Sequence, residues 1–294
     1  MNSVFDIINV PLGYLFKGIY ALVQNYGLTI VIFTLIVKFI MFPLTLKQQK
    51  SMKKTQALQP KLQALQEKYQ YDKEKLSQET MKLYQESGVN PMGGCLPLLI
   101  QFPILIALYN IIRKPLSYIM MMSNDRVMEI YKTLTGKAAD SFSRIDQLGL
   151  AKMMEEGAEK LGDIASEIIN FDFFGFDLSV TPSFQFISQH PLYILIPVLA
   201  GGTTFLVSHI SSKMAGTQNA NSQANSSMQT MNVIFPFMTA WFSITLPAGL
   251  GLYWTVSNLF QLAQTVIMNR FITVDVPEFD NGPKHFRERK KKKK

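Results

Sequence analysis

Cysteine is almost absent from this chain of 294 residues, which contains a single one, Cys95. One thiol can form neither an internal disulfide nor a cysteine-based metal cluster, so we interpret Cys95 as a buried, small apolar residue. Histidine is scarce as well, and the three positions 190, 209 and 285 show no metal-ligand spacing. Ser208–His209 has no third catalytic partner. The sequence therefore predicts no metal, no cofactor and no enzymatic activity.

Acidic residues are missing from the five apolar stretches that are long enough to cross a bilayer, each close to the ~20 residues that a span requires. These stretches are residues 28–46, 95–112, 191–210, 229–246 and 248–270. The last two are separated by a tight bend at Pro247. Together with an apolar content of 48%, they predict an all-α, polytopic membrane protein with five transmembrane helices.

A cleavable signal is also missing, because no basic segment precedes the apolar residues of Met1–Val23. No cysteine lies near residue 1, so we expect no lipoprotein-type anchor. The apolar residues of this segment recur at helical spacing, which predicts an amphipathic helix lying on the membrane surface over residues 1–24. We expect a membrane core over 25–270 and a basic tail over 271–294.

The charges between the spans predict the orientation. Residues 47–90 contain nine lysines and five acids, residues 114–190 contain seven basic residues and eleven acids, and residues 271–294 contain eight basic residues and four acids. Cytoplasmic loops are enriched in lysine and arginine. We therefore place 47–90 and the tail in the cytoplasm and 114–190 outside, with the N-terminus out and the C-terminus in.

Two of these connecting segments have patterns of their own. Residues 47–90 show leucines at helical spacing with a polar break near Tyr71–Asp72, which predicts an antiparallel helical hairpin; a plain solvated coiled-coil cap would show the same pattern. In the outer segment, residues 125–170 are amphipathic and helical in pattern. Residues 171–178, FDFFGFDL, contain four phenylalanines and suit the membrane–water boundary or a partner-binding patch.

Lys38 is the only charged residue in Leu28–Leu46. A charge near the bilayer centre costs about 2.5–3.5 kcal/mol on insertion scales, so a lysine there is expected to face a partner, a protein interior or water. The alternative, in which the lysine extends to the membrane surface, is disfavoured by its distance from both ends of the span. No acid in the spans can pair with it.

Further polar residues in the spans are expected to share a wet cavity with Lys38. Thr34 lies one helical turn away, Gln101 lies in the second span, and Trp254, Asn258, Gln261 and Thr265 form a polar stripe on the fifth. Amides and hydroxyls within a membrane usually point away from lipid. A cation in a wet groove would attract acidic or polar segments and lower the cost of moving them across the bilayer.

At this point three segments resemble a known family. Residues 36–69 (IVKFIMFPLTLKQQKSMKKTQALQPKLQALQEKY), 88–112 (GVNPMGGCLPLLIQFPILIALYNII) and 246–264 (LPAGLGLYWTVSNLFQLAQ) resemble the YidC/Oxa/Alb family of membrane protein insertases. The resemblance covers about residues 25–115 and 190–270. The small outer loop is similar to the forms found in Gram-positive bacteria.

The resemblance implies a bacterial cell-membrane protein that inserts and helps to fold other membrane proteins, alone or beside the Sec translocon. It implies a hydrophilic groove with a basic residue in the first span, usually arginine and here Lys38. Tyr253 and Trp254 match an aromatic region of that groove. Nascent clients would be the substrates, the tail would contact ribosomes, and no small molecule would be bound.

Two points remain open at this stage. The five lysines at 290–294 also suit a solvated run that binds anionic lipid headgroups or RNA by charge alone. A small-solute transporter or channel is the alternative function, although no coupling acid or inverted repeat supports it. An intramembrane hydrolase would need a serine–histidine or paired-aspartate arrangement that the spans lack.

Overall fold

The structure is a computed structural model that describes residues 6–88, 96–137, 142–157, 168–214 and 223–271. Five long helices dominate it: α2 (Tyr26–Ala57), α5 (Leu96–Arg113), α10 (Leu195–Met214), α11 (Gln223–Thr245) and α12 (Ala248–Phe271). Strand within these ranges is limited to the antiparallel pair β1 (Asp172–Phe173) and β2 (Phe176–Asp177). The predicted all-α fold class is confirmed.

The remaining helices occupy the two ends of the molecule and the region beside the N-terminus. They are α1 (Asp6–Val23), α3 (Gln59–Lys68), α4 (Lys73–Glu86), α6 (Pro115–Tyr118), α7 (Asn124–Thr135), α8 (Gln147–Glu156) and α9 (Phe184–Gln189), with 3₁₀ turns at Phe142–Arg144 and Pro191–Ile194.

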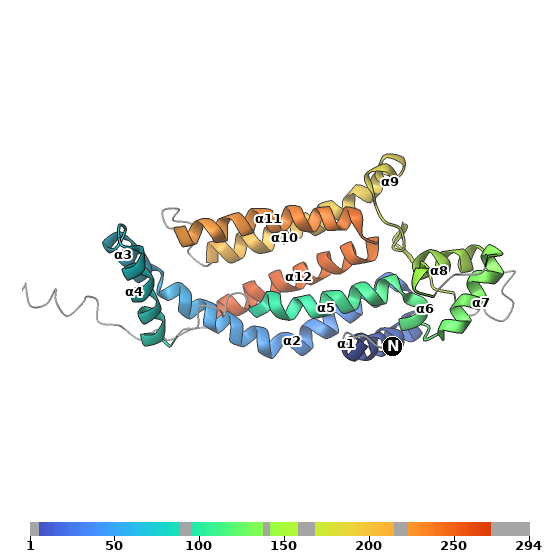
Figure 1. Ribbon diagram of the computed structural model, residues 1–294, viewed down its shortest axis with the longest axis horizontal. Coiled ribbons are helices and arrows are strands. Elements are labelled where there is room, and N and C mark those ends of the chain that lie inside the picture. Colours follow the sequence, from blue (N-terminus) through green and yellow to red (C-terminus); the bar gives the residue numbers. More distant parts are fainter. Residues whose placement is uncertain (1–5, 89–95, 138–141, 158–167, 215–222, 272–294) are drawn as a thin grey trace, which may run out of the picture.

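The long helices lie side by side along the longest axis of the molecule (Figure 1). Helices α10 and α11 form an antiparallel pair, and α12 lies between this pair and the α2–α5 side of the bundle. The α3–α4 hairpin lies at one end and α6–α8 at the other. The α3–α4 hairpin and the α6–α8 region are therefore apart, as they would be if the bundle crossed a membrane between them.

Two helical segments, Tyr26–Thr55 and Pro191–Lys213, are long and apolar enough to cross a membrane by length and composition. Shorter apolar helices cover Ile7–Val23, Gln101–Arg113 and Val233–Thr245. The number of five spans remains a prediction.

Helix α2 continues well past the predicted end of the first span. Pro43 lies inside it, and the helix ends only at Ala57, so residues 47–57 extend α2 rather than begin the hairpin. Lysine and glutamine are good helix formers, and nothing in this polar stretch interrupts the helix. The hairpin itself is α3–α4, and the backbone N–H of Lys75 donates to the carboxylate of Asp72, 3.0 Å away, at the start of α4. The predicted break near Tyr71–Asp72 is confirmed.

An aromatic cluster forms the core at the outer end of the bundle. The rings of Phe16, Tyr26, Phe33 and Phe171 contact one another at centroid distances of 4.9–5.7 Å. All four side chains are buried, and they join α1, α2 and the segment that precedes β1. The predicted amphipathic helix near the N-terminus is present as α1, and its buried face packs on α2, α5 and α6.

The phenylalanine-rich part of residues 170–180 takes a defined fold, and its location at the membrane–water boundary stays a prediction. Phe171 is buried in the core, and the segment folds into the β1–β2 hairpin with Phe174 and Gly175 at φ +52° and +81° in its turn. Phe174 alone projects outward, with 88% of its surface exposed. Strands of two residues are too short for an alternating pattern to reveal.

The same segment caps two long helices. The backbone N–H of Tyr26 donates to the carbonyl of Asn170 (3.0 Å), and the N–H groups of Ala248 and Gly249 donate to the carbonyls of Val180 (2.8 Å) and Leu178 (3.0 Å). The first N–H groups of a helix lack partners within the helix. Residues 170–180 therefore fix where α2 and α12 begin.

Replacing Gly27 with alanine is expected to loosen this cap. A Cβ atom at position 27 would lie 2.3 Å from Cγ of Phe173, so the β1–β2 hairpin or α2 must move. Overpacking of this kind costs about 1–3 kcal/mol. Thermal unfolding in detergent should show a lower melting temperature for Gly27→Ala than for the parent.

Gly18→Ala is the matched control, because nothing lies within 4 Å of a Cβ atom at position 18. Since alanine favours a helix over glycine, this variant should be as stable as the parent or more stable. Equal melting temperatures for the two variants would show that the hairpin does not pack against α2 as described.

Candidate functional site

Lys38 lies in α2 at the border between two faces of that helix. One face is buried and carries Phe33, Thr34 and Val37, whereas Phe39 and Ile40 are 64% and 68% exposed. The Lys38 side chain itself is half-buried. Lys38 is twelve residues, or ~18 Å of helix rise, from the outer end of α2. No hydrogen bond or ion pair joins its ammonium group to another described residue.

Thr34 needs no partner beyond its own helix. Its hydroxyl donates to the carbonyl oxygen of Ile30, 2.6 Å away, and the side chain is buried. Such a bond satisfies the hydroxyl donor locally. The structure thus places Thr34 one turn from Lys38, as the spacing predicts, but on the buried face.

Gln101 and Tyr253 come together as a bridge between two helices. The side-chain amide of Gln101 in α5 donates to the hydroxyl of Tyr253 in α12, and the tyrosine is buried. Both residues are predicted groove residues, and the structure brings them into direct contact. The bridge supplies a polar contact between α5 and α12 in an otherwise apolar stretch.

Helices α2 and α12 run in the same direction, which fixes the level of this bridge relative to Lys38. The rings of Phe39 and Phe260 are in edge contact with centroids 5.2 Å apart, and a Cβ atom on Gly249 would lie 3.1 Å from Cδ1 of Ile30. By this alignment Tyr253 lies about five residues, ~7 Å, nearer the outer end than Lys38.

Two members of the predicted polar stripe of α12, Trp254 and Asn258, contact the neighbouring helices α11 and α10. Nδ2 of Asn258 donates to the hydroxyl oxygens of Thr203 (3.1 Å) and Thr204 (2.8 Å) in α10. The ring of Trp254 stacks on Phe242 of α11, with centroids 6.3 Å apart. This amide therefore joins α12 to α10, and a cavity shared by Asn258 and Lys38 stays a prediction.

The sequence did not reveal two parts of this arrangement. The hydroxyls of Thr203 and Thr204 donate to carbonyls of their own helix, α10. Their oxygens also accept from Asn258 of α12, and the sequence of α10 alone does not reveal this second role. Gln264 is buried, and its Nε2 has no partner among the described residues. Gln261, which was predicted, is half-buried and makes no hydrogen bond to a described residue.

The electrostatic character of the site follows from what lies around it. No Asp or Glu occurs in the described parts of α5, α10, α11 and α12, or in α2. No group of three metal-ligating side chains occurs among the described residues. Neither the ammonium group of Lys38 nor Nε2 of Gln264 has a hydrogen-bond acceptor among the described residues. Nε2 of Gln264 is buried, whereas the half-buried ammonium group of Lys38 suits a ligand rich in carbonyl or carboxylate oxygens.

Two predicted features lie outside the described residues. They are the basic tail, apart from Phe271, and Cys95 with the glycine-rich part of the 88–112 motif.

Comparison with known proteins identifies a family and several related proteins. The sequence profile of the family described as 60Kd inner membrane protein matches residues 18–275. A protein of Fusobacterium nucleatum named membrane protein insertase YidC is 32% identical over 90% of this chain and 96% of its own length. Membrane protein insertase YidC 2 of Bacillus anthracis is 36% identical over 83% of this chain and 72% of its own.

Other relatives are much longer. The membrane protein insertase YidC of Prosthecochloris aestuarii is 30% identical over 92% of this chain but only 36% of its own length. The chain thus spans about a third of that relative.

The bond between Asn258 and α10 leads to a stability prediction. Asn258→Ala removes the amide donor to Thr203 and Thr204, and hydrogen bonds between membrane helices contribute about 1 kcal/mol. The variant should unfold at a lower temperature in detergent. In a double-mutant cycle its effect should be coupled to that of Thr204→Val, because both substitutions remove the same bond.

Gln261→Ala is the control on the same helix, since that amide bonds to no described residue. It should leave the melting temperature unchanged. If Asn258→Ala were as stable as Gln261→Ala, the interhelical bond would contribute nothing measurable.

Proposed function

The chain belongs to the 60Kd inner membrane protein family, and on that premise we propose that it inserts membrane proteins through a polar groove at Lys38. The relatives named as membrane protein insertases support this assignment. The observation that carries it is the position of Lys38, a half-buried cation deep in an apolar helix with no acidic partner among the described residues.

The proposed groove works by electrostatic attraction. An acidic or polar segment loses its hydration when it enters a bilayer, and a fixed cation offsets part of that cost. Lys38 would attract the outer segment of a single-span client, whose apolar helix would move along the spans into lipid. Gln101 and Tyr253, ~7 Å nearer the outer end, would offer the next polar groups along the path.

We propose the five-span topology with the N-terminus out and the C-terminus in. The positions of α3–α4 and α6–α8 at opposite ends of the bundle support it (Figure 1). The lysine-rich hairpin would lie in the cytoplasm and α1 in the membrane interface. Nascent chains, the Sec translocon, ribosomes at the basic tail and anionic lipids are the proposed partners. A solute transporter has no described coupling acid to support it.

Replacement of Lys38 tests the charge directly. In a strain depleted of its own insertase, Lys38→Ala and Lys38→Glu should reduce insertion of clients with acidic outer tails by about tenfold, which corresponds to about 1.4 kcal/mol. Lys38→Arg should be tolerated because the positive charge is kept. Protease accessibility of the client's outer tail measures insertion.

Lys47→Ala is the matched control, as Lys47 lies in the same helix but on its exposed, cytoplasmic part. It should insert every client normally. Full insertion of acidic-tailed clients by Lys38→Ala would disprove the charge mechanism. Cross-links from positions 38 and 254 to a stalled nascent chain would show separately whether clients enter the groove.

A further inference from the structure

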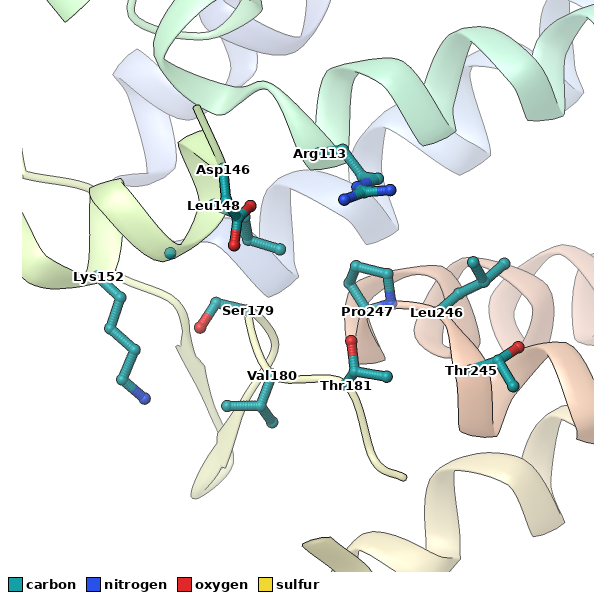
Figure 2. A pocket seen from close by; sticks show the side chains of 11 residues that line it. Arg113, Asp146, Leu148, Lys152, Ser179, Val180, Thr181, Thr245, Leu246 and Pro247 are labelled. Carbon is teal, nitrogen blue, oxygen red and sulfur yellow. The ribbon is translucent and has the colours of Figure 1, made fainter. Parts of the chain in front are cut away.

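A polar cavity lies at the outer end of the bundle, away from Lys38. It has a volume of about 370 Å³ and lies between the end of α5, the start of α8, residues 179–181 and the α11–α12 turn (Figure 2). Cavities of this size hold small ligands or headgroups. Its polar side chains are those of Arg113, Asp146, Lys152, Ser179, Thr181 and Thr245.

Arg113 and Asp146 bring opposite charges to the cavity without pairing. Nη1 of Arg113 donates to the hydroxyl of Tyr109, 2.8 Å away, which leaves its other N–H groups available. The hydrogen bond with Tyr109 and, further, the negative charge of Asp146 raise the pKa of Arg113. No ion pair joins the two residues in the described structure. Figure 2 shows both side chains directed toward the cavity.

The third charge at the cavity, Lys152, is already neutralised. Its ammonium group pairs with Asp177. Burial raises the pKa of Asp177, but hydrogen bonds from Lys152 and Ser179 outweigh it and hold this pKa below the ordinary value. A ligand would therefore meet one free cation and one free anion.

The cavity lies where the apolar parts of two long helices end. The apolar part of α5 ends at Ile112, and the apolar part of α11, Val233–Thr245, ends beside the cavity. Trp241 and Phe242, which are 56% and 40% exposed, lie within a turn of Thr245. Aromatic side chains concentrate at the level of lipid headgroups. An apolar surface for acyl chains therefore begins directly beside the cavity.

We propose that this cavity binds the headgroup of an outer-leaflet phospholipid that carries both a phosphate and an ammonium group, as phosphatidylethanolamine does. The guanidinium of Arg113 binds the phosphate, and the carboxylate of Asp146 accepts from the ammonium group. The acyl chains follow the exposed face of α11. A purely anionic headgroup gains the first contact but is repelled by Asp146.

Binding here would strengthen the outer end of the bundle. Residues 179–181 form one wall of the cavity, and the carbonyl of Val180 caps α12. A ligand that binds only the folded state raises the melting temperature. Phosphatidylethanolamine should raise it by roughly 2–4 °C for a chain of this size.

Native mass spectrometry of the full chain in detergent with equal phosphatidylethanolamine and phosphatidylglycerol tests the proposal. The parent should retain one phosphatidylethanolamine in at least fivefold preference. Arg113→Gln should reduce the retained lipid at least fivefold, and Asp146→Asn should keep lipid but lose the preference. Lys114→Gln is the control, because Lys114 is an exposed neighbour outside the cavity.

Retention of phosphatidylethanolamine by Arg113→Gln at the parent level would overturn the proposal, as would an unchanged preference in Asp146→Asn. The melting temperature of Arg113→Gln without added lipid identifies any folding defect. Soluble glycerophosphoethanolamine should stabilise the parent less than the lipid does, and equal stabilisation would overturn the lipid assignment in favour of a site for a small soluble zwitterion. A photo-cross-linker at Thr245 should label lipid, whereas labelling only of a client chain would refute the lipid assignment.

Discussion

The capping of α2 and α12 by one extended segment is the constraint on which the rest of the structure depends. Carbonyl groups from residues 170–180 accept hydrogen bonds from the first N–H groups of both helices. Unpaired N–H groups in apolar surroundings are costly, so the two helices must begin at this level. Because they then run in the same direction, the position of every polar group along α12 relative to Lys38 is fixed by the outer segment.

This alignment arranges the polar groups of the bundle along its axis. The Gln101–Tyr253 bridge lies ~7 Å nearer the outer end than Lys38, and Arg113 lies twelve residues of α5, or ~18 Å, beyond Gln101. A segment that moved outward would meet polar groups at successive levels rather than one isolated charge. Polar groups at such spacings would divide the free-energy cost of dehydrating the moving segment into several smaller steps.

The sequence was sufficient to predict the helices and to single out Lys38, because length, periodicity and a lone charge in an apolar run are local properties. It did not predict the partner of Asn258. Spacing shows that Trp254 and Asn258 share a face of α12, but the neighbour that this face meets depends on tertiary packing. For the same reason, the burial of Phe171 and the β1–β2 hairpin were not apparent, since their contacts come from α2.

The polar groups of the spans divide into two chemical classes. Thr34, Thr203, Thr204 and Asn258 have their donors satisfied inside the bundle, so their contribution is to stability. Lys38 and Nε2 of Gln264 are donors that meet no acceptor among the described residues. In the proposed groove, the unmatched cation of Lys38 would stabilise the carbonyls of an extended peptide and the carboxylates of acidic residues, and it would repel cations. Under the proposed function, a preference for clients with acidic outer tails would follow from this excess of donors.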